Sequence, residues 1–224
     1  ILAVVVLYFH RLNPFSPSKT QAQKRETVSL WLKVLVACIP AAAVGVPFDD
    51  RIDALFYNYR TVAVTLIIYG ILFIVIENRN RNRLCRTTKI SQMTLRTVLL
   101  IGVFQMLALI PGTSRSGATI VGAMLIGTSR SVAAGFSFFL SIPVMLGASL
   151  VKIVKFGFSF TGLELAVLLT GMAVAFAVSI AAIRFLMKYI QRHDFKAFGW
   201  YRIALGAIVL LYFLLSGAGV PAAG

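Results

Sequence analysis

Long apolar runs separated by short polar loops dominate the chain. An apolar stretch covers 1–9, and five longer ones lie near 29–47, 58–77, 131–151, 163–187 and 199–217. A membrane-spanning helix needs about 20 mostly apolar residues, and an open sheet cannot satisfy its backbone in lipid. We therefore predict an all-α, polytopic membrane helix bundle that forms a single integral membrane domain over 1–224.

The first apolar stretch is too short to span a membrane. A helix over residues 1–9 rises about 13.5 Å, less than half of a hydrocarbon core of about 30 Å. The chain also begins with Ile1 rather than Met. We expect that the start of this span, and the sequence before it, are missing.

Composition and charge support a membrane protein. Hydrophobic residues make up 59% of the chain, whereas soluble domains are usually about 45–50% apolar. A net charge of +15 can indicate nucleic-acid binding, but the Lys and Arg residues gather in short loops between apolar runs, so we predict no nucleic-acid partner. Loops 10–28, 78–96 and 184–198 are basic, and loop 48–57 is acidic. The positive-inside rule places the first three in the cytoplasm and the fourth outside.

The segment 95–128 decides the topology. A single crossing would place the basic loop 184–198 outside, so the segment must cross zero times or twice. Its two arms, 97–110 and 117–127, are too short for full spans. We predict a re-entrant helical hairpin that enters from the cytoplasm and turns at 111–117, PGTSRSG. Irregular backbone at that depth lies inside protein or lines a watery cavity, and we expect a cavity that opens to the outside.

The chemistry of this turn centres on Arg115. An Arg at the centre of a spanning helix costs about 2.5–3.5 kcal/mol, so it marks a functional site by default. Its planar fork of N–H donors suits phosphate, and Gly112 and Gly117 let the backbone approach a ligand closely. The helix that follows directs its free N–H groups toward an anion. With Ser114 and Ser116 beside Arg115, the turn is predicted to be a phosphate cradle inside the bilayer.

Other residues near the turn allow alternatives. A serine of the turn can simply cap the second arm, while Arg115 bonds carbonyl groups of the first. Thr113 lies within the turn, and Thr119 lies one helical turn after Arg115, so its hydroxyl can face the same cavity. Gln105, in the first arm, either reaches the cavity or bonds a neighbouring helix.

The pentapeptide GTSRS occurs a second time at 127–131, where the hairpin returns to the cytoplasmic side. Its two copies lie at opposite ends of one short helix, so they cannot both line one pocket. We predict that Ser129 or Ser131 caps the next helix and that Arg130 is an ordinary cytoplasmic-side cation.

Acidic residues are scarce, and none lies in the hairpin. Glu77 ends a span beside the basic loop and is expected to pair with Arg79 or Arg81. The acids of loop 48–57 are expected to form a solvated turn; they are Asp49, Asp50 and Asp53.

Three blocks of the chain resemble the bacterial undecaprenyl-diphosphate phosphatases of the bacitracin-resistance type. They are GVFQMLALIPGTSRSGATIVGAMLIGTSR at 102–130, FSFFLSIPVMLGAS at 136–149, and the tail around Phe198 with YRIALG at 201–206. The resemblance covers essentially the whole chain, and its first block is highly specific.

The resemblance implies a function, a fold and a set of site residues. Such enzymes hydrolyse undecaprenyl diphosphate to undecaprenyl phosphate and inorganic phosphate, which recycles the carrier for peptidoglycan synthesis and confers resistance to bacitracin. They act at the outer face of the bacterial plasma membrane, require a divalent cation (Mg²⁺ or Ca²⁺), and have an inverted repeat with two re-entrant hairpins. The residues implied at the diphosphate are Arg115 as the catalytic group, Ser114, Ser116, Thr119 and Thr113 as ligands, and Gly112 and Gly117 as turn residues.

The chain also departs from this family. The family's glutamate-rich first motif matches nothing in 1–224, so no base, nucleophile or metal ligand is assigned, and we expect the 224 residues alone to be inactive. The implied partners are a polyprenyl diphosphate and membrane lipids, and the oligomeric state is left open. A transporter or flippase of a polyprenyl-phosphate lipid is the alternative function, because broken helices around an ion site are a transporter pattern. A purely structural subunit ranks last.

Overall fold

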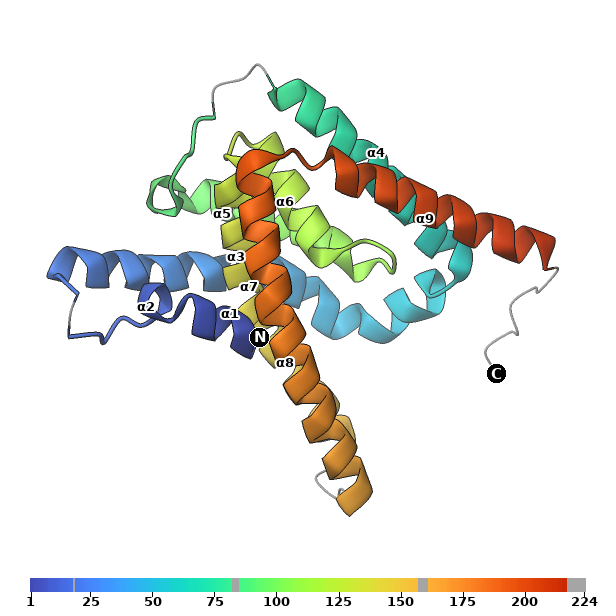
Figure 1. Ribbon diagram of the computed structural model, residues 1–224, viewed down its shortest axis with the longest axis horizontal. Helices are drawn as coiled ribbons and strands as arrows, with labels where there is room; N and C mark the ends of the chain where they lie inside the picture. Colours follow the sequence, from blue (N-terminus) through green and yellow to red (C-terminus); the bar gives the residue numbers. More distant parts are fainter. Residues whose placement is uncertain (18, 82–84, 157–160, 217–224) are drawn as a thin grey trace.

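The computed structural model describes residues 1–17, 19–81, 85–156 and 161–216, and these are almost entirely helical (Figure 1). Arg83, in the predicted basic loop, and residue 217 of the last predicted span lie outside the described residues. The elements are α1 (Leu2–Leu7), α2 (Phe9–Leu12), α3 (Gln21–Phe56), α4 (Tyr59–Asn80), η1 (Ile90–Gln92), α5 (Leu95–Met106), η2 (Leu107–Leu109), α6 (Arg115–Leu125), α7 (Arg130–Phe156), α8 (Gly162–Arg192) and α9 (Lys196–Leu215).

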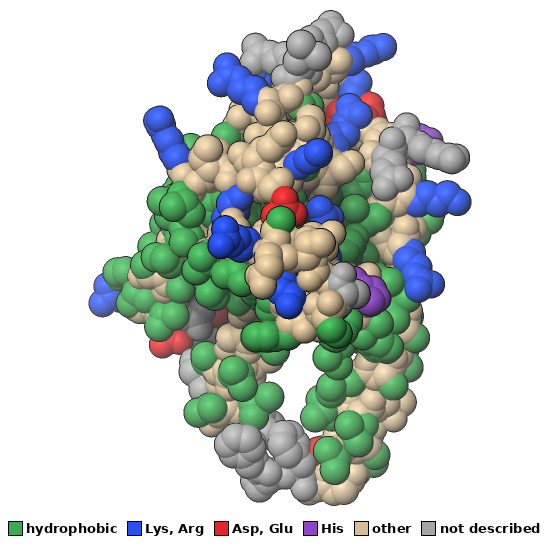
Figure 2. Space-filling view, turned by 90° about the vertical axis from the view of Figure 1, so that its left-hand side faces the viewer, with side chains coloured by type: hydrophobic (Ala, Val, Ile, Leu, Met, Phe, Trp, Pro, Cys, Tyr) green, Lys and Arg blue, Asp and Glu red, His purple; other side chains and the backbone are tan. Residues whose placement is uncertain are grey.

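Five helices are long and apolar enough to cross a membrane, which confirms the five predicted spans. They are α3, α4, α7, α8 and α9. Only 6% of the most apolar stretch of α8 is buried, as expected of a helix that faces lipid all round. Figure 2 shows Lys and Arg side chains over the upper part of one face and mostly hydrophobic side chains over its lower part.

Helix α3 differs from the prediction at both ends. It begins at Gln21 because Thr20 and Gln23 form a capping box, in which the Thr20 side chain accepts from the Gln23 N–H at 3.4 Å and the Gln23 side chain accepts from the Thr20 N–H at 3.1 Å. It then continues through Pro40 and Pro47 to Phe56. The expected turn at 48–57 is therefore wrong. Proline removes a backbone donor and crowds the preceding helical turn, but spanning helices tolerate it where neighbouring groups satisfy the freed backbone groups.

The acids of this region accordingly lie on a helix rather than in a turn. Asp50 and Asp53 are exposed on the last turns of α3, and the Asp53 carbonyl accepts from the Tyr57 N–H at the helix end. The backbone of Asp49 belongs to the same helix.

Helices α5 and α6, with η2 between them, form the predicted hairpin. Its two ends lie side by side: the Ser129 N–H donates to the Thr87 carbonyl at 2.9 Å, and the Arg86 N–H donates to the Gly127 carbonyl at 3.0 Å. The segment after α6 therefore returns to the same end of the molecule as the segment that precedes α5. Because α5 has 12 residues and α6 has 11, neither arm reaches across a bilayer.

Small residues bring the helices close around the hairpin. A methyl group placed on Gly102 of α5 would lie 2.5 Å from the Ala37 carbonyl oxygen of α3. One placed on Gly199 of α9 would lie 2.7 Å from the Gly70 carbonyl oxygen of α4. Such backbone contacts are typical of helix packing in lipid. They place α3 on one side of the hairpin, and Figure 1 shows α4 and α9 side by side near its turn.

Candidate active site

The turn between α5 and α6 is seated against α4. Gly112 has φ +84°, the left-handed region that favours glycine. A methyl group here would also lie 2.6 Å from the Val62 carbonyl oxygen of α4. One residue earlier, the Pro111 carbonyl accepts a hydrogen bond from the Thr65 hydroxyl at 2.9 Å. The geometry therefore requires glycine at 112 and positions the turn from outside the hairpin.

A second arginine, Arg202 of α9, also reaches the turn. Its Nη2 donates to the Gly112 carbonyl at 2.8 Å, and its guanidinium carbon lies 5.9 Å from the centre of the Tyr69 ring. The Nη1 atom would lie 3.6 Å from a methyl group on Gly117. Sequence reasoning missed this residue, although a lone Arg inside the apolar run 199–217 is a signal of the same kind as Arg115.

Arg115 is the first residue of α6 and is half-buried. Its guanidinium makes no hydrogen bond to any described residue, and its Nη1 is a buried atom without a partner. The side chain faces the region of Cys38 on α3. The structural alternative, in which Arg115 bonds carbonyl groups of the first arm, is wrong for the described residues, because its guanidinium bonds none of their carbonyl groups. The fork of Arg115 remains available for a ligand.

The serines of the turn begin helix α6. The Ser114 hydroxyl accepts from the Gly117 N–H at 3.2 Å, so the predicted cap is confirmed for Ser114. It also lies 3.0 Å from the Ser116 hydroxyl. The start of α6 thus combines two linked hydroxyl groups with the free backbone N–H groups of a helix N-terminus.

Thr119 points elsewhere than expected. Only 1% of the residue is exposed. Its hydroxyl lies 2.7 Å from the Ser137 hydroxyl of α7 and donates to the Arg115 carbonyl at 3.0 Å. A buried hydroxyl needs such partners, and here they face α7 rather than an open cavity. The expectation that the Thr119 hydroxyl shares a cavity with the Arg115 side chain is therefore wrong.

Two further residues of the prediction are buried. Thr113 is buried within the turn, where its N–H donates to the Ile110 carbonyl at 3.1 Å. The side chain of Gln105 is buried on α5, and neither its Oε1 nor its Nε2 bonds a described residue. Five buried side-chain atoms lack a partner in the described part of the chain, and four belong to Gln105, Arg115 and Arg202. The buried polar atoms that lack a hydrogen-bond partner thus lie mainly on the hairpin and on Arg202, which contacts the turn of the hairpin.

The second GTSRS copy holds the helices together. The Arg130 Nε donates to both carboxylate oxygens of Glu77 at 2.9 Å, and the same carboxylate accepts from the Phe195 N–H at 3.2 Å. The expected pairing of Glu77 with Arg79 or Arg81 is wrong. Glu77 is 1% exposed, and a carboxylate buried so deeply requires a partner that reaches it inside the protein.

Ser129 of the same copy caps α7. Its hydroxyl accepts a hydrogen bond from the Val132 N–H at 3.4 Å. Of the two serines predicted to cap this helix, Ser129 and Ser131, the structure therefore selects Ser129.

The turn does not resemble a cation site. Among the described residues, no group of three or more His, Cys, Asp and Glu side chains lies together. Mg²⁺ and Ca²⁺ prefer carboxylate and carbonyl oxygens, whereas the side chains at the turn are guanidinium and hydroxyl groups. The donor set therefore suits an anion, and no divalent cation ligand is assigned in the described part of the chain.

Comparison with known proteins identifies the family. The family model described as "Bacitracin resistance protein BacA" matches residues 1–208. The chain belongs to this family. It is 64% identical to the undecaprenyl-diphosphatase of Acetivibrio thermocellus over an alignment of 214 residues. This alignment covers 96% of the chain and 79% of that relative. It is 62% identical over 216 residues to undecaprenyl-diphosphatase 1 of Clostridium acetobutylicum, with 96% and 79% covered. With the undecaprenyl-diphosphatase of Enterococcus faecalis, identity is 58% over 219 residues, again with 96% and 79% covered.

Proposed function

We propose that this protein hydrolyses undecaprenyl diphosphate to undecaprenyl phosphate and inorganic phosphate. The observation that carries the proposal is the unpaired guanidinium of Arg115 at the start of α6, on a turn enclosed by apolar helices. The match to the family supports the substrate class, because relatives 57–64% identical are named undecaprenyl-diphosphatase. That name describes a hydrolase and favours hydrolysis over the transporter alternative.

The turn suits the chemistry of phosphoryl transfer. In such reactions the protein mainly positions the phosphoryl group and stabilises charge on its oxygens. Arg115 would hold two oxygens of one phosphate through its fork. The first N–H groups of α6 and the Ser116 hydroxyl would face the same anion. Arg202 holds the turn through the Gly112 carbonyl, so it acts on the substrate through the position of Arg115.

The remaining predicted ligands have more limited roles in this proposal. Ser114 caps α6 and aligns Ser116 through the contact between their hydroxyls. Thr119 anchors α6 to α7 through Ser137. A divalent cation, Mg²⁺ or Ca²⁺, enters the proposal through the family resemblance alone, and we assign it neither ligands nor a step.

Apolar helix faces provide room for the long isoprenyl chain. Exposed leucine and valine side chains line α8, among them Leu163 and Val167, which are 77% and 66% exposed. We place the protein in the bacterial plasma membrane with its turn accessible from the outside. The basic loops, which follow the positive-inside rule, support this orientation.

Phosphate release by the purified complete protein tests the function directly. In detergent no gradient exists, so a transporter would release no phosphate from undecaprenyl diphosphate, whereas the proposed hydrolase would release one phosphate per lipid. Absence of release under conditions in which the Enterococcus faecalis relative is active would overturn the proposal.

A further inference from the structure

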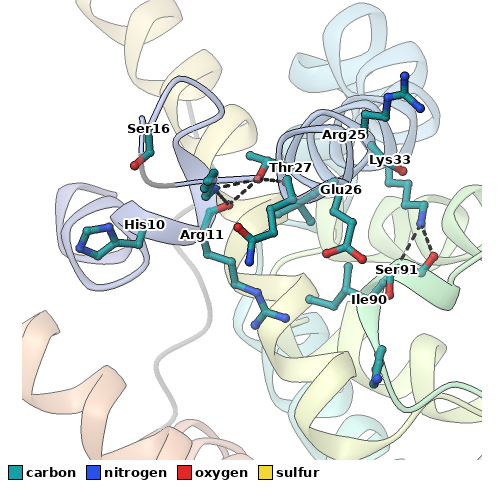
Figure 3. Close-up of a pocket in the computed structure, with 14 residues that line it drawn as sticks. His10, Arg11, Ser16, Arg25, Glu26, Thr27, Lys33, Ile90 and Ser91 are labelled. Carbon is teal, nitrogen blue, oxygen red and sulfur yellow. Dashed lines mark hydrogen bonds between the residues drawn. The ribbon is translucent and has the colours of Figure 1, made fainter. Parts of the chain in front are cut away.

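A basic hollow lies at the end of the molecule where α3 begins. Its volume is about 830 Å³, and its walls come from α2, the loop that follows it, the first turns of α3, and η1 (Figure 3). Volumes of about 300–1,000 Å³ are typical of sites that hold a small ligand. The hollow is lined by one acidic residue, Glu26, and by the basic residues His10, Arg11, Lys19, Arg25, Lys33 and Lys89.

Two lysines hold the walls in place. The Lys19 Nζ donates to the Asn13 carbonyl and to the Thr27 hydroxyl, both at 2.8 Å. The Lys33 Nζ donates to the Ser91 carbonyl at 2.9 Å, and the residue is 8% exposed. These bonds tie the loop after α2 and the 3₁₀ helix η1 to α3, so the hollow is a built feature of the fold.

Three other cations around the hollow have no such role. The side chains of Arg11, Arg25 and Lys89 are exposed and make no hydrogen bond or ion pair with any described residue. Glu26 interacts electrostatically with the buried Lys33. These three cations come from separate segments that line one hollow, and no ion pair with a described acid neutralises them. An anion bound in the hollow would interact favourably with all three.

The surroundings of the hollow suit a lipid surface. The spanning stretch of α3 runs from Gln21 to Phe48, so the hollow lies at one end of a membrane span. Beside the lining residues His10 and Ser16 stand Phe9 and Phe15, which are 52% and 87% exposed. Exposed aromatic side chains next to Lys and Arg are typical of segments that lie in the headgroup region. Basic pockets between spanning helices bind the head groups of anionic lipids.

We infer that this hollow binds the phosphate of an anionic phospholipid head group, of the phosphatidylglycerol class. The lipid belongs to the leaflet at the basic end of the protein. The site is separate from the hairpin turn, because none of the residues that line the hollow belongs to the turn at 111–117. The inference does not depend on the proposed hydrolysis.

Lipid retention tests this site in the complete protein. Native mass spectrometry would compare dioleoyl-phosphatidylglycerol with dioleoyl-phosphatidylcholine on wild-type protein and on the triple variant Arg11→Gln, Arg25→Gln, Lys89→Gln. The matched control, Arg79→Gln, Arg81→Gln, Arg96→Gln, removes three exposed cations outside the hollow. Because only the hollow variant removes cations that surround the bound phosphate, we expect it to lose at least about 10-fold in preference for phosphatidylglycerol, while the control stays within about 3-fold of wild type.

Each other outcome overturns the inference. Equal losses in both triple variants would mean that diffuse surface charge attracts the lipid. Unchanged preference in the hollow variant would mean that the lipid binds elsewhere. Displacement of phosphatidylglycerol by millimolar inorganic phosphate would identify a site for free anions. Should the triple variant fail to fold, the single variant Lys89→Gln carries the same comparison against Arg96→Gln.

Discussion

Arg202 donates a hydrogen bond to the Gly112 carbonyl at 2.8 Å, across 90 positions of sequence. This bond gives the two arginines of the turn different tasks. Arg202 is committed to the backbone of the turn, and Arg115 keeps its fork free of described partners. The variants of the two residues should therefore differ in stability as well as in activity.

Replacement of Arg115 should abolish most of the activity without loss of structure. A lysine keeps the charge but cannot offer a planar fork, so Arg115→Lys should lower the rate of phosphate release on the order of 100-fold, as loss of one stabilising donor typically does. Arg79→Lys, an exposed residue outside the turn, is the control. Turnover close to wild type in Arg115→Lys would contradict the assignment.

Replacement of Arg202 should lower stability and activity together. Arg202→Met removes a hydrogen bond from a charged group, which contributes about 1.5–3 kcal/mol. We expect a lower unfolding temperature in detergent and a lower kcat, because the turn that carries Arg115 is no longer held. A lower rate with an unchanged unfolding temperature would instead indicate that Arg202 contacts the substrate.

Gly112 should tolerate no side chain. Gly112→Ala places a methyl group at a positive φ, which costs about 1–2 kcal/mol, and presses it against the Val62 carbonyl. Thermal unfolding should show clear destabilisation. Gly147→Ala on α7 is the matched control, since no described atom outside the adjoining backbone of α7 lies within 4 Å of a methyl group there. Equal stability of the two variants would show that the turn relaxes freely.

The ion pair between Glu77 and Arg130 should be essential for folding. Glu77→Gln removes the charged partner of the partly exposed Arg130, whereas Arg130→Gln leaves the buried Glu77 carboxylate unpaired, which typically costs about 3–5 kcal/mol. Asp53→Asn, at an exposed acid, should be nearly neutral. Chemical denaturation of the single variants and of the double variant with Arg130→Gln measures the coupling. Additive losses would mean that the two residues stabilise the fold independently.

Thr119 should act as an anchor between α6 and α7. Thr119→Val and Ser137→Ala each remove a buried hydrogen bond of about 1 kcal/mol, and their effects should not add, because they break the same contact. The rate of phosphate release should fall much less than in Arg115→Lys. Loss of hydrolysis in Thr119→Val with full stability would make its hydroxyl a direct ligand of the diphosphate.

The sequence by itself determined the features that depend on local pattern. Apolar length predicts five spans, loop charge predicts that the hairpin turns back, and the triplet around Arg115 indicates both an anion site and the cap at Ser114. The spans and the Ser114 cap are confirmed because helix length and capping involve residues within a few positions of one another, whereas the anion site stays a prediction. The same local pattern misplaced the end of α3, where charged residues and proline continue a helix instead of ending it.

Only the tertiary structure decided which distant residues meet. Arg202 reaches Gly112 across 90 positions, Arg130 reaches Glu77 across 53, and Thr119 meets Ser137 of another helix. Which buried polar groups find each other depends on how the helices pack, and a local pattern carries no information on that packing. The free fork of Arg115 is known for the same reason, since only the packed structure shows that no described residue bonds it.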